Sequence, residues 1–453
     1  MAANIQPLET KEPIDVITSP FTRFARMEAA GSVLLLAATA VALLWANSPW
    51  EQSYYTIWNG HLRIGLGRFV LNETRLQWID DGLMSIFFFL VGLEIKREVL
   101  IGELSSLKQA VFPLISAVGG TIVPALLYLS VNHGTAAQKG WGIPMATDIA
   151  FALGALVALG NRISVSLKVF VTALAIIDDI IAILVIAVFY THSIHFFSLV
   201  IGLAGVIVSA IANLLGIRKP SVYAFIGVCV WCAVLESGVH ATIAGVLLAF
   251  TIPSRTSINR DHFIRRSRWL IDRFAEAVPG SFEENSAIHS LETQCELIES
   301  PLHRIEHRLQ PWVGFFVMPV FALANTGVRI AGNVAAASKH PVAWGVLLGL
   351  LLGKPIGISL FAWFSTKFGA ARPAESSWWQ IFGVSWLCGV GFTMSLFIAT
   401  LAFGEGSFQD MAKISTLTAS FLAGSLGFVF LSIGTRRVHR ADRPALDTSR
   451  KAA

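Results

Sequence analysis

The chain has few charged residues and few cysteines for its length. Asp, Glu, Lys and Arg make up only 14% of the 453 residues, whereas soluble domains carry roughly one quarter. This shortage excludes a single water-soluble core. Three of the four cysteines lie inside apolar runs, which argues against a disulfide framework. Residues 1–27 lack the short apolar core of a secretory signal, so we expect insertion to depend on the first true span.

Long hydrophobic runs take up most of the sequence instead. Hydrophobic residues form 54% of the chain, and its mean hydropathy is +0.65. A bilayer-spanning helix needs about 20 apolar residues, and these runs lack the alternating polarity of membrane β-strands. We therefore predict an all-α polytopic membrane protein with about twelve transmembrane helices, of which the pair between 220 and 252 could also be one interrupted helix. The predicted spans are 28–47, 78–101, 110–131, 140–159, 165–190, 197–216, 220–236, 238–252, 312–330, 342–365, 381–403 and 412–434.

Basic residues are distributed unequally between the two sides that alternating spans define. One side receives about 26 of the 34 lysines and arginines, and the other receives seven. Cytoplasmic loops of membrane proteins carry the excess of Lys and Arg. Both termini are therefore predicted in the cytoplasm, with residues 435–453 as a basic tail. We interpret the net charge of +5 as an orientation signal and expect no nucleic-acid partner.

Two polar stretches interrupt the predicted transmembrane domain, residues 28–434. Residues 48–77 contain short alternating segments that predict an external β-hairpin, which is suited to joining two protomers. Residues 254–308 predict a long cytoplasmic loop, first basic and then acidic, with a helical pattern at 264–274. Nothing in this loop resembles a catalytic module, so we expect neither an enzyme nor a bound cofactor.

A few ionisable residues fall at membrane depth, where charge is costly. They are Asp148, Asp178, Asp179, Lys354 and, near the break in the short helical pair, His240. Such charges commonly mark an ion path, although a structural ion pair is the alternative for any one of them. Three acids cannot all be neutralised by one base, so at least one carboxylate must face water, a proton or a cation. Asp80 and Asp81 lie at the mouth of a span, where we expect a solvated or capping role.

Asp178 and Asp179 are neighbours on one predicted helix. Consecutive helical residues point about 100° apart, so the two carboxylates should have different surroundings. One can face a water-filled cavity while the other turns to a partner helix, where Lys354 is the available base. Close carboxylates in a low dielectric need compensating charge, which a proton or an alkali cation can supply. No Cys or His cluster suits a transition metal.

Glycine and proline interrupt two of the predicted spans. The interruptions are Gly142 and Pro144 in one span and Gly389 and Gly391 in the other. Paired interruptions in the two halves of a chain indicate an inverted-repeat transporter with its site at the midplane. Facing helix amino ends favour a carboxylate and facing carboxyl ends favour a cation, for which Asp148 and Lys354 are the candidates. Glycines that serve only close helix packing are the alternative.

Seven motifs spread over nearly the whole chain carry a resemblance to a known family. They are FFFLVGLEIKRE (87–98), GIPMATDIAFALG (142–154), ALAIIDD (173–179), SGVHATIAG (237–245), FALAN (321–325), GKPIG (353–357) and GFTMSLFIA (391–399). Together they resemble the NhaA sodium/proton antiporters. The resemblance implies an NhaA-like fold with two crossing broken helices, placed in a bacterial inner membrane as a homodimer. The rule on paired interruptions was drawn partly from this family and is not independent of the resemblance.

The resemblance also implies roles for single residues. Asp179 is the expected principal carboxylate for the cation and the proton, with Asp178 beside it as the partner of Lys354. Thr147 and Asp148 are expected at the helix crossing, so Na⁺ is expected near Asp179 and Asp148. The expected pH-response residues are Glu94, Arg97, Glu98, His240, Glu306 and His307. The long cytoplasmic loop exceeds what the family leads us to expect, so the pH of activation does not follow.

We therefore expect a secondary active antiporter that exports Na⁺ and Li⁺ in exchange for external H⁺. The exchange should be electrogenic and activated at alkaline pH, in the service of intracellular pH and sodium homeostasis. Its expected partners are small cations, protons and membrane lipid. An intramembrane aspartyl protease, which needs two carboxylates at membrane depth, and a passive cation channel are the rival hypotheses. Proteolysis has no use for an adjacent Asp pair with a membrane Lys, and a channel would not couple proton movement.

Overall fold

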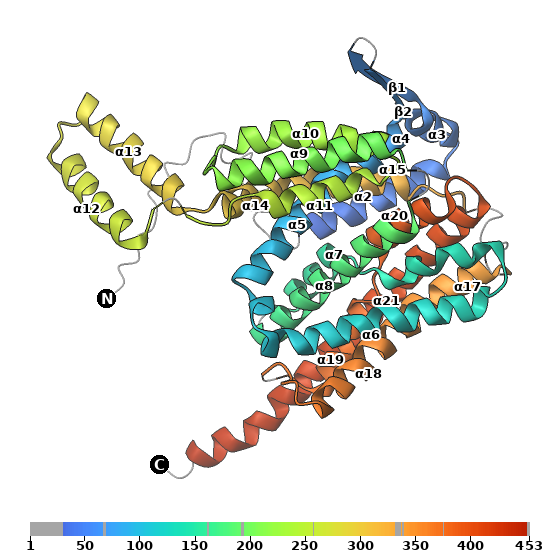
Figure 1. The fold of residues 1–453 in the computed structure, drawn as a ribbon. Helices are drawn as coiled ribbons and strands as arrows, with labels where there is room; N and C mark the ends of the chain where they lie inside the picture. The colour runs from blue at the N-terminus through green and yellow to red at the C-terminus, as the bar shows by residue number, and fades with distance from the viewer. Residues whose placement is uncertain are drawn as a thin grey trace.

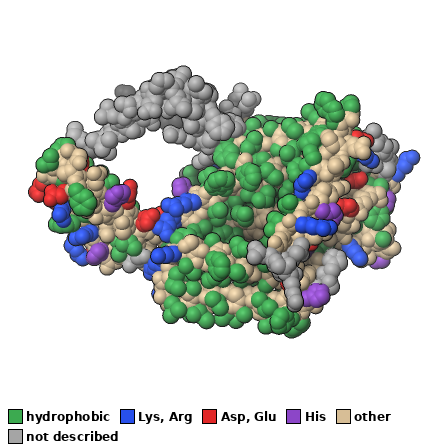
Figure 2. Space-filling model, turned by 90° about the horizontal axis from the view of Figure 1, so that it is seen from above, with side chains coloured by type: hydrophobic (Ala, Val, Ile, Leu, Met, Phe, Trp, Pro, Cys, Tyr) green, Lys and Arg blue, Asp and Glu red, His purple; other side chains and the backbone are tan. Residues whose placement is uncertain are grey.

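The computed structural model describes residues 30–450 except 67–68, 161–162, 192–193, 257, 331–336, 338 and 375. The predicted amino-terminal segment 1–27 lies outside the described residues. Helices dominate the rest, and most of them run side by side across the bundle (Figure 1). Hydrophobic side chains cover much of the face of this bundle in Figure 2, as a lipid environment requires.

The first half of the chain supplies the β-hairpin segment and the first set of long helices. Its elements are α2 (Ala30–Ala46), α3 (Glu51–Asn59), β1 (His61–Leu66), β2 (Phe69–Thr74), α4 (Arg75–Gln77), η1 (Trp78–Leu83), α5 (Met84–Leu100), η2 (Glu103–Ser105), α6 (Leu107–Asn132), η3 (Ala136–Met145), α7 (Ile149–Ala158), α8 (Val165–Phe189) and α9 (Phe196–Leu214).

The second half contains a further set of helices, several of them short. Its elements are α10 (Pro220–Glu236), α11 (Ala241–Thr251), α12 (Arg260–Glu276), α13 (Phe282–Ile298), α14 (Pro301–Trp312), η5 (Val313–Val317), α15 (Met318–Asn325), α17 (Pro341–Leu348), η6 (Gly349–Gly353), α18 (Lys354–Lys367), α19 (Trp378–Leu387), α20 (Phe392–Phe403) and α21 (Ser407–Arg450). The predicted tail from 435 therefore continues the last helix as far as Arg450.

Each predicted span contains helix, but the helices differ in length and do not fill every span. Six described helices are long and apolar enough to cross a membrane by themselves, or up to eight if each bent pair counts as one span. The pair between 220 and 252 is two helices, α10 and α11, because Gly238 between them has φ +77°. A left-handed residue ends an α-helix, and glycine adopts this conformation without steric cost.

The two polar stretches fold differently from each other. Residues 48–77 contain the predicted hairpin, with β1 antiparallel to β2 and His61 opposite Thr74. Residues 254–308, predicted as a connecting segment with helix at 264–274, contain more helix than expected, because this stretch forms α12, α13 and the start of α14. Asn259, Ser281 and Ser300 cap the three helices. The side chain of each accepts a hydrogen bond from the backbone N–H of the residue three positions later. These caps extend helix well beyond the periodic core at 264–274.

Close backbone contact between α6 and α18 depends on a glycine pair. A Cβ on Gly357 would lie 2.2 Å from the carbonyl oxygen of Gly119, and a Cβ on Gly119 would lie 2.4 Å from that of Gly357. Any side chain there forces the helices apart, which is the usual reason for small residues between membrane helices. The contact matters for the site described below, since α18 begins at Lys354.

We predict that Gly357→Ala destabilises the protein by about 1–3 kcal/mol, because the added methyl group overpacks the contact between α6 and α18. The measurement is the Tm of the purified protein in detergent. Gly314→Ala is the control, since a Cβ on Gly314 meets nothing within 4 Å. Equal Tm values for the two variants would contradict the prediction.

Candidate cation site

Two interrupted helices meet inside the bundle. One break separates η3 from α7, and the other separates α19 from α20, where the chain bends by 47°. The two breaks bond to each other: Asp148 N donates to Val390 O (2.7 Å), and Thr147 Oγ1 donates to Cys388 O (2.9 Å). Backbone groups released from a helix at membrane depth require such partners, because lipid offers none. The predicted interruptions therefore lie against each other.

The Asp148 side chain bonds to the amino ends of two helices at once. One of its oxygens accepts from Phe151 N at 3.1 Å in the first turn of α7. The other accepts from Thr393 N at 3.2 Å and Thr393 Oγ1 at 2.5 Å at the start of α20. A carboxylate is the group that the positive ends of helix dipoles favour, and Asp148 is only 1% exposed. It thus holds the crossing together.

Lys354 lies beside this crossing and reaches a second carboxylate. Its ammonium forms an ion pair with Asp178 and donates to Thr147 Oγ1 at 2.7 Å. Thr121 of α6 donates to the other oxygen of Asp178 at 3.3 Å. Lys354 follows π-helical η6 and is fully buried, and π-helical turns are frequent at functional sites. The pair satisfies the one buried base of this cluster with one of its acids.

Asp179 is the acid that this arrangement does not satisfy. It is 1% exposed, and its Oδ2 atom has no hydrogen-bond partner. Its electrostatic neighbours include the carboxylates of Asp178, Glu94 and Asp148, opposed by one ammonium. A buried carboxylate in such company needs a proton or a cation as compensating charge. Carboxylate oxygens are among the ligands that hard cations take.

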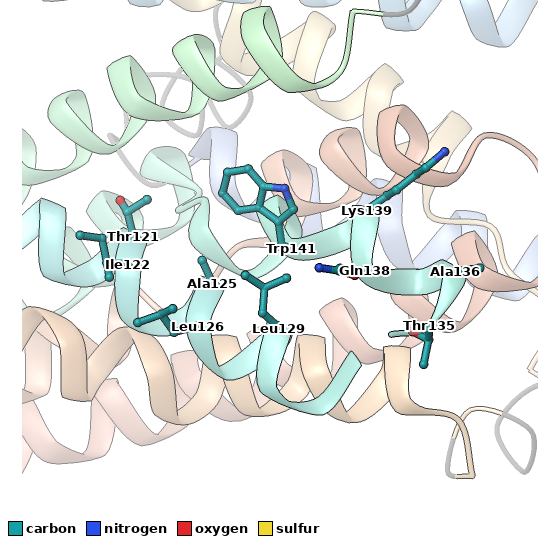
Figure 3. A pocket seen from close by; sticks show the side chains of 10 residues that line it. All are labelled: Thr121, Ile122, Ala125, Leu126, Leu129, Thr135, Ala136, Gln138, Lys139 and Trp141. Carbon is teal, nitrogen blue, oxygen red and sulfur yellow. The ribbon is translucent and has the colours of Figure 1, made fainter. Parts of the chain in front are cut away.

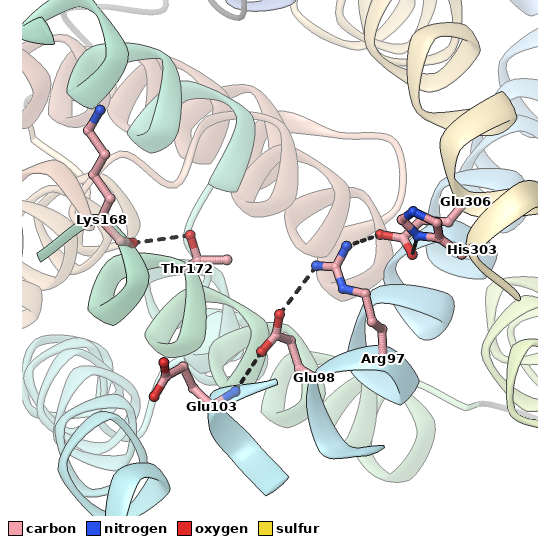
Figure 4. A network of polar contacts seen from close by, with 7 residues as sticks. All are labelled: Arg97, Glu98, Glu103, Lys168, Thr172, His303 and Glu306. Carbon is pink, nitrogen blue, oxygen red and sulfur yellow. Dashed lines mark hydrogen bonds and ion pairs between the residues drawn. The ribbon is translucent and has the colours of Figure 1, made fainter. Parts of the chain in front are cut away.

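Most of the expected pH-response residues lie in a separate network, between α5 and α14 (Figure 4). Arg97 forms an ion pair with Glu306 and approaches Glu98 at 3.3 Å. Glu94 lies one turn before Glu98 on α5 and interacts electrostatically with the same three residues. His307 stacks on His303, whose ring lies 4.0 Å from Glu306. The structure thus brings five of the six residues together at one end of α5.

His240 belongs to another part of the molecule. It precedes α11 and lies 3.8 Å from Asp81 and against the ring of Phe397. The expectation of a solvated Asp80 was wrong. Asp80 is 7% exposed and accepts a hydrogen bond from Asn325 at 2.7 Å, because η1 is packed against the end of α15. Sequence position could not show that a span mouth is covered by another helix.

Two hydroxyl groups of the site did not stand out in the sequence. Thr393 follows the second interruption by two residues, so its place after Gly391 was a usable signal. Thr121 lies in an apolar helix with no break or charge near it, and only the packing of α6 on α8 brings it to Asp178. Neither could be assigned a partner before the fold was known.

One cavity in the described part of the chain lies beside this cluster and not within it. It has a volume of about 650 Å³ and runs between α6 and η3 (Figure 3). None of its lining residues is acidic, and it reaches the carboxylates only through Thr121. The lining residues are Thr121, Ile122, Ala125, Leu126, Leu129, Thr135, Ala136, Gln138, Lys139 and Trp141. Its composition does not suit a small cation.

Comparison with known proteins identifies the family. A family model described as Na⁺/H⁺ antiporter 1 matches residues 22–431. The chain belongs to this family. An Na⁺/H⁺ antiporter NhaA of Koribacter versatilis is 66% identical over 420 residues, which are 92% of this chain and 92% of that protein. The NhaA antiporters of Oleidesulfovibrio alaskensis and Helicobacter pylori are 47% and 42% identical, over 94% of this chain and 96% and 98% of their own lengths.

Membership of the NhaA family decides between the hypotheses on the class of protein. The chain is a multi-pass membrane transporter and not an enzyme. The rival hypothesis of an intramembrane protease is thereby wrong.

We predict that Thr393→Val lowers stability by about 1–3 kcal/mol, because it removes the hydroxyl donor to the buried Asp148 carboxylate at nearly unchanged side-chain volume. The free energy of unfolding in detergent is the measurement. Thr418→Val is the matched control, since the Thr418 hydroxyl is exposed and bonds only to Ile414 O of its own helix. A loss of equal size in both variants would argue against the Asp148 contact.

Proposed function

We propose that this transporter exports Na⁺, and Li⁺ with it, in exchange for external H⁺. The observation that carries the proposal is the unpartnered Oδ2 of Asp179, a buried carboxylate whose electrostatic neighbours are three further carboxylates and a single ammonium. The three relatives named above are Na⁺/H⁺ antiporters and are 42–66% identical to this chain. Their names support the same substrates.

In this proposal the cation and the proton compete for one cluster of oxygens. Asp179 binds Na⁺ when it is deprotonated, and Asp148 and Thr147 contribute oxygens from the helix crossing. A cation at Asp179 supplies the same compensating charge as a proton, so the two exclude each other. Movement of the crossing then exposes the loaded site to the other side, where protons displace the cation.

Lys354 and Asp178 set the charge balance of the cycle in this proposal. Their ion pair contributes no net charge while it is intact. If Asp178 gives up Lys354 during the cycle, a second carboxylate becomes available and more than one proton enters for each cation expelled. Exchange of unequal charge is electrogenic and is driven by the membrane potential.

We also propose that residues Glu94, Arg97, Glu98, Glu306 and His307 form the pH-responsive entrance, with His240 acting separately. The ion pair of Arg97 with Glu306 ties α5, which carries Glu94 toward the site, to α14. Carboxylates and histidines concentrated at one helix end change charge with pH and thereby change this tie. Such an arrangement supports activation at alkaline pH.

The architecture in this proposal has twelve spans related as inverted repeats, in a bacterial inner membrane with both termini in the cytoplasm. The helices at all twelve predicted spans and the two crossing breaks support this arrangement. The β1–β2 hairpin lies beyond the bundle in Figure 1 and is available to join two protomers as a homodimer. Intracellular pH and sodium homeostasis is the role that such an exchanger serves.

We predict that Asp179→Asn reduces Na⁺-dependent collapse of a pH gradient in inverted vesicles to the level of vesicles without the protein. The amide cannot carry the charge that a cation must balance. Asp272→Asn, on the exposed surface of α12, should transport like the wild type. Wild-type exchange by a correctly folded Asp179→Asn protein would refute the site assignment.

We further predict that Na⁺ added to the purified protein at alkaline pH releases protons, whereas choline does not. The release should fall more than tenfold in the Asp178→Asn/Asp179→Asn double variant, because the competing carboxylates are gone. A pH indicator in weakly buffered detergent solution measures it. Binding of Na⁺ without proton release would favour the passive channel over exchange.

A further inference from the structure

The α12–α13 hairpin is a surface that the transport proposal does not use. Its two helices pack mainly on each other, around the buried side chains of Leu270 and Ala287. Figures 1 and 2 show the hairpin projecting from the bundle. Charged side chains gather on it in Figure 2, in contrast to the hydrophobic bundle.

α12 carries five arginines against three acidic residues, Asp261, Asp272 and Glu276, and so has a positive balance. Two of its arginines lie on an exposed aromatic ring. Across the described residues, none of its arginines has a carboxylate within 4.0 Å. Arg266 and Arg273 lie over the ring of Trp269, at 4.3 and 5.3 Å from its centre, and this Trp is 44% exposed. Trp and Arg are the residues most enriched at the energetic centres of protein interfaces. The arginines of α12 are Arg260, Arg265, Arg266, Arg268 and Arg273.

α13 presents the opposite charge on the same hairpin. Glu283, Glu292 and Glu296 are exposed along it, and Phe282 at its start is 87% exposed. Glu292 contacts His289 at 3.1 Å and Glu296 lies 3.7 Å from Arg304, whereas Glu283 has no ion-pair partner among the described residues. A surface with a basic and an acidic helix side by side is self-complementary under a two-fold axis: the basic helix of each copy meets the acidic helix of the other. The charges of the hairpin therefore fit a second copy of this chain.

We propose that the α12–α13 hairpins of two copies clasp each other, with α12 of one against α13 of its partner. The inference rests on the homodimer proposed above. In Figure 1 the hairpin and β1–β2 lie at opposite ends of one flank of the bundle, with α9 and α10 between them. α9 is the least buried of the six long apolar helices, with 17% of its most apolar stretch buried against 44–61% for the others. The clasp extends the dimer contact along this flank.

The lipid surface is a poorer occupant for the hairpin. The hairpin reaches beyond the ends of the spans in Figure 1, away from the bundle. The anionic cytoplasmic leaflet attracts arginine but repels the acidic α13 that is attached to α12. A second copy satisfies both helices, whereas a membrane satisfies one.

The test is a charge swap in the full-length protein. Arg266→Glu with Arg273→Glu on α12, and separately Glu283→Arg with Glu292→Arg on α13, should each raise the dimer dissociation constant tenfold or more. Like charges brought face to face oppose association. The chain carrying all four changes should return to within about threefold of the wild type, because each helix again meets its opposite. Sedimentation of labelled protein in detergent measures the constants.

Lys139→Glu with Lys339→Glu is the matched control for the α12 variant, since it makes the same change of net charge as Arg266→Glu with Arg273→Glu, at exposed residues away from the hairpin. It should leave the dissociation constant unchanged. Unaltered dimers in both hairpin variants, or failure of the fourfold variant to restore association in a protein of wild-type Tm, would overturn the clasp. So would reversals that alter only binding to vesicles of anionic phospholipid. A wild-type monomer that still exchanges Na⁺ for H⁺ would overturn the dimer and the clasp but leave cation exchange standing.

Discussion

The need to satisfy backbone groups where two helices break inside the membrane governs the centre of this structure. Thr147 and Asp148 do so by bonding across to Cys388 and Val390. The Asp148 carboxylate then joins the amino ends of α7 and α20. An unpaired N–H or C=O in hydrocarbon costs several kcal/mol, so the two breaks cannot separate without new partners. The breaks form one unit, and the carboxylate cluster is built around it.

The same unit also determines which of the buried carboxylates is neutralised. Lys354 donates a hydrogen bond to Thr147 at the crossing and forms an ion pair with Asp178. Asp179 points elsewhere, because adjacent helical residues differ by about 100° in direction. Within a single turn of α8, Asp178 thus has an ion-pair partner, whereas the Oδ2 atom of Asp179 has no hydrogen-bond partner. A site that prefers one compensating charge and tolerates either kind is the simplest basis for exchange.

Polar groups away from the crossing join neighbouring helices to one another. Arg97 joins α5 to α14 through Glu306, and Asn325 joins α15 to η1 through Asp80. α14 also continues from the projecting hairpin, and Arg304 of α14 lies 3.7 Å from Glu296 of α13. Helix α14 therefore connects the α12–α13 hairpin to the ion pair of Arg97 with Glu306.

How much the sequence could predict differs between the fold and the site. Apolar run length and the Gly and Pro interruptions were enough for a helical membrane protein with two broken helices, since bilayer thickness and backbone hydrogen bonding leave few alternatives. The alternating segments of 48–77 were enough for the hairpin. The extent of helices α12 and α13 was underestimated because their polar residues conceal a helical period, and because capping by Asn259 and Ser281 decides where they begin.

The sequence by itself determined which groups are out of place: Asp148, Asp178, Asp179 and Lys354 are charged residues in apolar runs, and their cost in lipid is a property of composition and position. Tertiary structure alone decided how those charges are distributed. The packing of α6 and α20 lets Thr121 and Thr393 donate hydrogen bonds to Asp178 and Asp148, respectively. Asp80 became buried because η1 meets α15. Contacts of this kind join residues 57 to 245 positions apart, and no local pattern encodes them because they depend on which helix faces cover one another.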